Sequence, residues 1–285
     1  MRSRHMETQK YHPEAPRAYE PIALELNASD INSAMQAYLA FLELPDTERA
    51  KIAYFNEQRP RIGSSGYVHK EATDIKHVFH MTQELERAFA PNIYRLPTES
   101  KVLLKIGQEI YYSLAKSSTE KLAELEEEIP LLVGIHSPRS GKRQHHLRFL
   151  AYQAGRDGVL AHGHYDKGTG TIAVAESHGG LRIGYRESDL ERIDRSSYEP
   201  LFFPGYGWHQ LAQMLDVAPR RRAAWHDVTD TGERVDDKTL RWSLIYFIDP
   251  ANLYFDSTQE QTHTPIPWRG LGRQALRSDG KSFLV

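Results

Sequence analysis

The spacing of hydrophobic positions changes about halfway along the chain. In residues 7–131, apolar side chains recur mainly every three or four positions, which predicts amphipathic helices. Residues 30–54 show this spacing with a break at Pro45, and residues 101–128 show it over the longest stretch without a proline. We therefore expect the N-terminal part, residues 7–131, to be mostly helical.

From about residue 132 the pattern consists of short apolar runs separated by Gly, Pro, Asp and Ser. The runs cover residues 147–152, 170–176, 179–185, 199–205 and 240–248. Strands of this length and spacing are typical of a β-sandwich or barrel. We expect a mainly β protein with flanking helices (α+β), with its β-core in residues 132–250 and an irregular or helical tail in residues 251–285.

Composition removes several function classes. The chain has 36 Lys and Arg against 38 Asp and Glu, a formal net charge of −2, so no overall field attracts nucleic acid or an anionic membrane. It has no cysteine, which excludes disulfides, thiolate metal sites and a cysteine nucleophile, so any metal needs His and carboxylate ligands. Without an apolar stretch of membrane-spanning length or a signal-peptide core, we expect a cytoplasmic protein. Residues 1–6 resemble a cloning scar.

One β-forming segment carries polar side chains that are costly to bury without partners. Residues 161–183 include His164 and Asp166, two positions apart. In an extended strand such residues point to the same side, so an imidazole and a carboxylate would reach one spot while Tyr165 faces away. The pair predicts a cation site, although a surface ion pair would have the same spacing.

Later strands add residues of matching chemistry. His226 lies in a short apolar run, where a core histidine bonded to the backbone is the alternative explanation. Arg241 and Ser243 share one face of a strongly β-forming run, and a guanidinium beside a hydroxyl suits the far carboxylate of a dicarboxylate. Two His and one carboxylate on one face of a metal leave three positions open, as in non-haem Fe(II) oxygenases.

The order His164-x-Asp166, His226, Arg241-x-Ser243 resembles that of the Fe(II)/2-oxoglutarate-dependent dioxygenases. The flanks look most like the isopenicillin N synthase-like branch of that family. The resemblance covers about residues 30–250 and includes the segments 38–52 (YLAFLELPDTERAKI), 66–81 (GYVHKEATDIKHVFHM), 147–153 (LRFLAYQ) and 164–183 (HYDKGTGTIAVAESHGGLRI).

The resemblance implies a single oxygenase domain over residues 7–285 with a double-stranded β-helix (jelly-roll, cupin-like) core. It implies oxidative decarboxylation of 2-oxoglutarate to succinate and CO2, coupled through O2 to hydroxylation of a small-molecule substrate. The implied site residues are His164, Asp166 and His226 as Fe(II) ligands, Arg241, Ser243 and Tyr152 for 2-oxoglutarate, and Tyr67 and Arg182 for the substrate.

The chain also departs from the branch. Leu150 stands where Asn is general, Asp227 follows His226 where Arg is usual, and residues 229–238 lengthen the turn before Arg241. None of these positions is an implied metal ligand. We therefore expect retained chemistry and a divergent substrate.

Several alternatives stay open. An isopenicillin N synthase-like oxidase or cyclase without 2-oxoglutarate fits the same Arg-x-Ser pair, and desaturation or ring closure could replace hydroxylation. A cupin-like protein could bind a metal or a carboxylate without turnover. A zinc hydrolase could use the same three ligands, but it would leave Arg241 unexplained. The oligomeric state and the identity of the substrate are also open.

Overall fold

The computed structural model describes residues 17–52, 66–71, 74–82, 85, 90–136, 145–154, 158–194 and 197–249. The expectations for residues 1–6 and 251–285 lie outside these residues.

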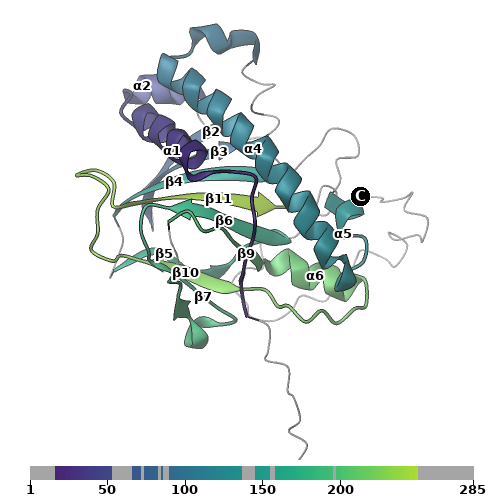
Figure 1. Ribbon diagram of the computed structural model, residues 1–285. Helices are drawn as coiled ribbons and strands as arrows, with labels where there is room; N and C mark the ends of the chain where they lie inside the picture. The colour runs from purple at the N-terminus through teal and green to yellow at the C-terminus, as the bar shows by residue number, and fades with distance from the viewer. Residues whose placement is uncertain are drawn as a thin grey trace, which may run out of the picture.

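Two antiparallel sheets form the centre of the molecule (Figure 1). The large sheet has the strand order β1 (Glu20–Pro21), β9 (Leu201–Pro204), β6 (Gly170–Glu176), β11 (Arg241–Ile248), β4 (His146–Ala154), β3 (Ile75–Met81) and β2 (Gly66–Lys70). The small sheet has the order β5 (Val159–Tyr165), β10 (Trp225–Thr229), β7 (Leu181–Gly184) and β8 (Glu191–Arg192). From β4 to β11 the chain passes repeatedly from one sheet to the other, which is the jelly-roll arrangement implied by the resemblance.

The helices predicted over residues 30–54 and 101–128 are present, with shorter ones beside them. They are α1 (Ala28–Leu42), α2 (Asp46–Arg49), η1 (Ala50–Ile52), η2 (Ala90–Arg95), α4 (Thr98–Glu124), η3 (Leu125–Glu127), α5 (Leu132–His136), η5 (Glu187–Asp189) and α6 (Tyr206–Met214). Pro45 separates α1 from α2, as predicted, because it fixes a backbone conformation suited to a helix start. The short helices α5, η5 and α6 lie in the part of the chain expected to be the β-core and were not predicted. No helix in the described part of the chain has the length and apolar character to cross a bilayer.

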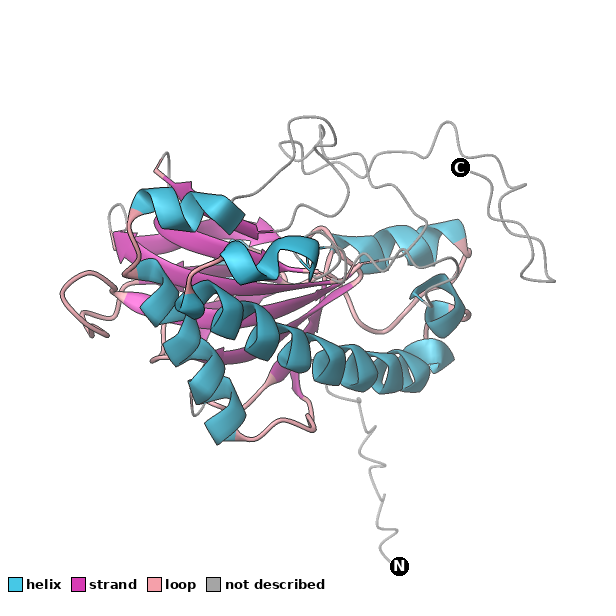
Figure 2. Cartoon of the chain, turned by 90° about the horizontal axis from the view of Figure 1, so that it is seen from above, coloured by secondary structure: helices cyan, strands magenta, loops and turns pink. Residues whose placement is uncertain are grey.

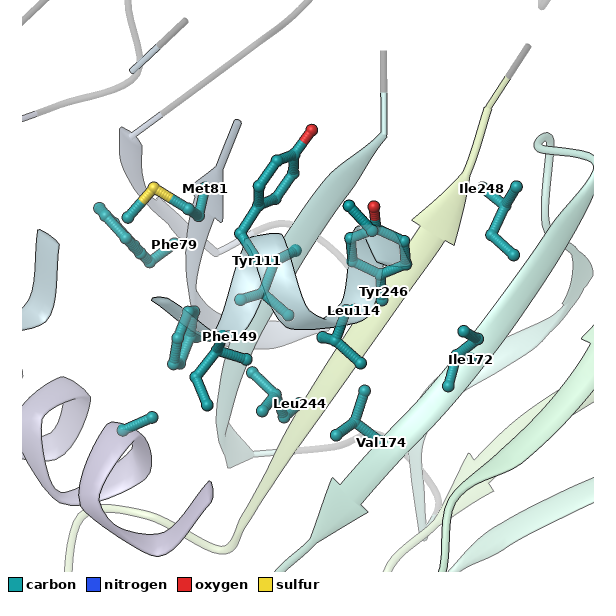
Figure 3. Packing of buried hydrophobic residues seen from close by; sticks show 14 of the residues in the cluster. Phe79, Met81, Tyr111, Leu114, Phe149, Ile172, Val174, Leu244, Tyr246 and Ile248 are labelled. Atoms are coloured by element: carbon teal, nitrogen blue, oxygen red, sulfur yellow. The ribbon is translucent and has the colours of Figure 1, made fainter. Parts of the chain in front are cut away.

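The large sheet has an outer face covered by helices and an inner face turned toward the small sheet. Figures 1 and 2 show α1 and α4 lying across the outer face. Phe149 and Leu244 pack there with Leu114 of α4 (Figure 3). Because side chains alternate along a strand, the intervening residues Leu150 and Tyr152 join a second apolar cluster between the sheets.

The N-terminal part contributes strands as well as helices. Strands β2 and β3 form a hairpin, and β3 pairs with β4 at the edge of the jelly-roll core. No clear alternation marked β3 in the sequence because every residue from His77 to Met81 is buried, including His77 and His80. A strand buried on both faces does not show the period of two that predicts a half-buried one.

His136 connects α5 to the segment between β5 and β6. Its Nδ1 donates to the Leu132 carbonyl at 2.7 Å, and its Nε2 accepts from the Thr169 hydroxyl at 2.8 Å. The ring is buried, and burial lowers the pKa of His136 to about 4. The imidazole is therefore neutral in the folded protein at pH 7.

This lowered pKa predicts acid sensitivity. The pKa of His136 in the folded protein lies below the ordinary value of 6.5. The neutral imidazole therefore makes its full contribution to the free energy of unfolding above pH 6.5, and this contribution is lost as the pH falls through about 4. Between pH 7.5 and 5, urea unfolding should show the stability advantage of the wild type over His136→Gln shrinking by about 2 kcal/mol. A constant difference would contradict this account, and His209→Gln, on α6, serves as the control.

Candidate metal centre and carboxylate site

The structure brings His164, Asp166 and His226 together at one end of the small sheet. His164 and His226 face each other across the β5–β10 pairing, with ring centroids 4.4 Å apart, and Asp166 directly follows β5. The Nε2 atoms of His164 and His226 lie 3.5 and 3.6 Å from the two carboxylate oxygens of Asp166. One ligand atom from each residue lies within 4.8 Å of the others, as a shared metal ion requires. We call these three residues the triad.

Neighbouring groups orient the triad. The Nδ1 atom of His164 donates to the His162 carbonyl at 2.7 Å, and that of His226 donates to the Ala224 carbonyl at 3.4 Å. Both Nε2 atoms are thereby left for a metal. The Thr171 hydroxyl donates to Asp166 Oδ2 at 2.6 Å, which fixes the carboxylate.

The electrostatics of the triad favour cation binding. Burial raises the pKa of Asp166, but His226, His164 and the Thr171 hydroxyl together hold that pKa well below its usual range. Burial lowers the pKa of His226, despite the opposing effect of Asp166. The site therefore presents an ionised carboxylate beside a neutral imidazole, the forms that bind a divalent metal.

The triad is open on one side. The side chain of His164 is 49% exposed, whereas those of Asp166 and His226 are buried. Three protein ligands grouped in this way leave coordination positions for other molecules, and the exposed edge at His164 offers a route to them.

The predicted carboxylate-binding residues also meet, on the inner face of the large sheet. Arg241 and Ser243 lie opposite Tyr152 and Leu150 in the β11–β4 register. Arg241 is only 2% exposed, and its guanidinium carbon lies 5.8 Å from the centroid of the Tyr152 ring. Leu150, which replaces the usual Asn, therefore contributes an apolar neighbour to Ser243.

Sequence reasoning missed the anion that faces Arg241. The Nη2 atom of Arg241 donates to Glu176 Oε2 in an ion pair in which both side chains are 2% exposed. The Nε atom of the same guanidinium donates to the His178 carbonyl at 3.3 Å. The chain itself therefore supplies one counter-ion for the buried arginine.

A β-bulge brings Glu176 to this position. Leu244 pairs with Ala175 and Ile245 with Ala173, so Val174 is an extra residue in β6. Val174 and Ala175 both pack in the outer cluster, whereas Glu176 faces Ser243 on the inner face. Without the bulge, regular alternation from Ala173 would have turned Ala175 inward, and no sequence signal marked the bulge.

Two buried polar atoms of this site have no hydrogen-bond partner: Arg241 Nη1 and Ser243 Oγ. Burying a donor without a partner costs free energy, so these two atoms call for a partner from outside the chain, either water or a ligand. A guanidinium N–H and a hydroxyl suit a carboxylate. The residues therefore fit the far carboxylate of 2-oxoglutarate.

Lys76 is a second residue that sequence reasoning did not assign, although its Asp-x-Lys segment was part of the resemblance. It pairs with Tyr152 in the β3–β4 register, and its Nζ lies 5.2 Å from the ring centroid of that tyrosine. Asp74 binds the ammonium at 3.1 Å. Burial lowers the pKa of His164, but Asp166 and the His162 carbonyl together raise it above its ordinary value, and the nearby charge of Lys76 opposes that rise.

The two predicted substrate residues are not brought to the triad. Tyr67 packs against Phe41 in the outer cluster, and its hydroxyl bonds to His77 Nδ1 at 2.7 Å. Arg182 lies between Leu181 and Ile183 on β7, and the side chains of these two neighbours face the space between the sheets. Because side chains alternate along a strand, that of Arg182 points away from this space. Both residues therefore lie on the faces of their strands opposite to the triad, and their contact with a substrate stays a prediction.

The position of Arg182 also explains Asp227. Their side chains form a double hydrogen bond across the β7–β10 register, with Arg182 Nε donating to Asp227 Oδ1 at 2.8 Å. The unusual aspartate after His226 therefore has a structural partner.

A cavity of about 430 Å³ lies elsewhere, beside β1, β8 and β9. Its lining includes Arg17, Glu20 and Arg221 but no member of the triad and neither Arg241 nor Ser243. The chemistry of the side chains, rather than the size of a cavity, therefore identifies the candidate site.

No protein-family profile and no curated protein sequence matches the chain. Solved structures do. A full-length Neurospora crassa protein in complex with alpha-KG and 5-formyluracil is 17% identical, with a TM-score of 0.61 over 87% of this chain and 81% of that one. JOX2 in complex with 2OG, Fe and JA is 15% identical, with a TM-score of 0.62 over 84% and 69%. The rice dioxygenase for auxin oxidation is 16% identical, with a TM-score of 0.57 over 82% and 74%. The jelly-roll fold implied by the resemblance is confirmed.

Removing the Thr171 hydroxyl should weaken metal binding. Thr171→Val keeps the shape of the side chain but leaves Asp166 Oδ2 without its donor. We expect about tenfold weaker binding of Co(II), measured by calorimetry. Thr119→Val, which removes a hydroxyl on α4 that bonds to Ala115, should leave the affinity unchanged. Equal affinities for wild type and Thr171→Val would contradict the assigned role.

Replacing Arg182 should affect stability rather than the metal site. Arg182→Ala leaves the buried Asp227 carboxylate without its guanidinium, so the free energy of unfolding should fall by about 1 kcal/mol. Urea unfolding measures the loss, and Arg186→Ala, at an exposed ion pair, should cost less. A loss of Co(II) affinity in Arg182→Ala would contradict this account, because it would show that Arg182 contributes to metal binding by the triad.

Proposed function

We propose that the protein is an Fe(II)- and 2-oxoglutarate-dependent oxygenase that oxidises a C–H bond of a small molecule. Helices α1 and α4 pack on the sheet that carries Arg241, which supports a single oxygenase domain over residues 7–285.

One observation carries this proposal. Between the same two sheets, the chain combines a two-His-one-Asp triad with two unpartnered buried donors, Arg241 Nη1 and Ser243 Oγ. A zinc hydrolase has no use for the second feature. An oxygenase that chelates a 2-oxo acid at its metal uses both, because the acid has one end for the metal and a far carboxylate for the arginine.

Each residue has a defined part in this proposal. The triad would hold Fe(II), which supplies the redox chemistry that couples decarboxylation of 2-oxoglutarate to oxidation of the substrate by O2. Thr171 and the His162 carbonyl orient two of the ligands. Arg241 and Ser243 bind the far carboxylate, and the Tyr152 ring beside Arg241 forms a wall of its site.

A small-molecule substrate is supported by the solved structures of the same fold. Their bound molecules include 5-formyluracil and thymine in the Neurospora crassa protein. Hydroxylation, desaturation and ring closure all begin with oxidation of a C–H bond, so the product of the reaction decides between them.

A second candidate is an oxidase of the same fold that binds Fe(II) but not 2-oxoglutarate. The ion pair between Arg241 and Glu176 favours it, because the arginine already has one counter-ion. Binding of 2-oxoglutarate to the metal-loaded protein separates the two candidates.

Anaerobic titration with Fe(II) and 2-oxoglutarate tests the proposal. We expect a metal-to-ligand charge-transfer band, and release of succinate when O2 and a substrate are supplied. Arg241→Ala should bind Fe(II) but need at least about tenfold more 2-oxoglutarate for the band. Arg234→Ala, in the exposed insert, is the control. Absence of the band in the iron-loaded wild type would overturn the use of 2-oxoglutarate and leave the oxidase.

A further inference from the structure

We propose that Glu176 determines the affinity for the cosubstrate by competing with its far carboxylate for Arg241. This inference rests on the proposed function and concerns the same site. Glu176 would then help to determine specificity. It would reduce the preference of the site for 2-oxo dicarboxylic acids over 2-oxo monocarboxylic acids.

The contacts show that the guanidinium is only partly used. Glu176 accepts from Nη2 and the His178 carbonyl accepts from Nε, whereas Nη1 has no partner. Ser243 lies directly opposite Glu176 in the β11–β6 register, and its Oγ also has no partner. A carboxylate that bonds to Nη1 and Ser243 would therefore lie beside the Glu176 carboxylate.

The charges then do not balance. One buried guanidinium would face two carboxylates, and like charges repel strongly where water is excluded. The other cation beside Tyr152, Lys76, is already paired with Asp74 at 3.1 Å. A dicarboxylic acid therefore gains less from Arg241 than it would from an arginine without a counter-ion.

Glu176 has the opposite effect on the protein without cosubstrate. It neutralises a guanidinium that is 2% exposed, and an unpaired charge at that depth is strongly destabilising. The bulge at Val174 is what turns Glu176 to this face. Stability of the empty site and affinity for the dicarboxylic acid should therefore change in opposite directions when the charge of Glu176 is removed.

The test uses Glu176→Gln, which keeps the side-chain length and an acceptor for Nη2 but removes the charge. Calorimetry on the Fe(II)-loaded protein under anaerobic conditions measures the binding of 2-oxoglutarate and of 2-oxobutyrate, which lacks the far carboxylate. We expect Glu176→Gln to bind 2-oxoglutarate at least about tenfold more tightly than the wild type and 2-oxobutyrate equally well. Its melting temperature without ligand should be lower than that of the wild type.

Glu128→Gln is the matched control. It removes the charge from another carboxylate that binds an arginine, Arg221, away from the site. It should lower the melting temperature without changing either affinity. Equal or weaker binding of 2-oxoglutarate by Glu176→Gln would overturn the inference, and so would equal tightening for both acids.

The wild type alone gives a second test, which does not depend on the folding of a variant. If Glu176 competes for Arg241, the wild type should bind 2-oxoglutarate less than about tenfold more tightly than 2-oxobutyrate. If Arg241 had no counter-ion in the chain, this ratio of affinities should be about a hundredfold or more. A preference in the second range would overturn the inference while leaving the proposed function intact. Failure of the iron-loaded wild type and Glu176→Gln to bind 2-oxoglutarate would overturn both.

Discussion

The large sheet is buried on both faces, and strict alternation of side chains along its strands separates two different tasks. The outer residues of β4 and β11, such as Phe149 and Leu244, pack beneath α1 and α4 and anchor the sheet. The inner residues of the same strands, Tyr152, Arg241 and Ser243, form the candidate carboxylate site. A shift of register by one residue would exchange the two sets, so the helical packing and the chemistry depend on the same pairing.

The bulge in β6 is a local exception to this alternation, and it changes the character of the site. It places Glu176 rather than Ala175 opposite Ser243 and so gives Arg241 a partner within the chain. A charge buried this deeply is tolerated only when it is paired. The ion pair gives Nη2 of Arg241 a hydrogen-bond acceptor, whereas Nη1 has no acceptor within the chain.

The triad has a simpler origin. Antiparallel pairing of β5 and β10 sets His164 opposite His226, and the two-residue spacing brings Asp166 to the same side. Burial alone would raise the pKa of the aspartate, but the two imidazoles and the Thr171 hydroxyl reverse the effect. The cluster is therefore held in a metal-binding form by its own neighbours.

The sequence by itself determined the residue types and local periods. These were enough to predict the helices on either side of Pro45, the long helix α4, the β-rich second half and the pair His164 and Asp166, because spacings of two, three and four residues reflect local geometry. The family resemblance joined His226 to that pair. Only the tertiary structure decided which faces meet. It turned Tyr67 and Arg182 away from the triad, extended the sheet with β2 and β3, and paired Glu176 with Arg241. Bulges and register depend on contacts between residues far apart in the chain, which no local pattern records.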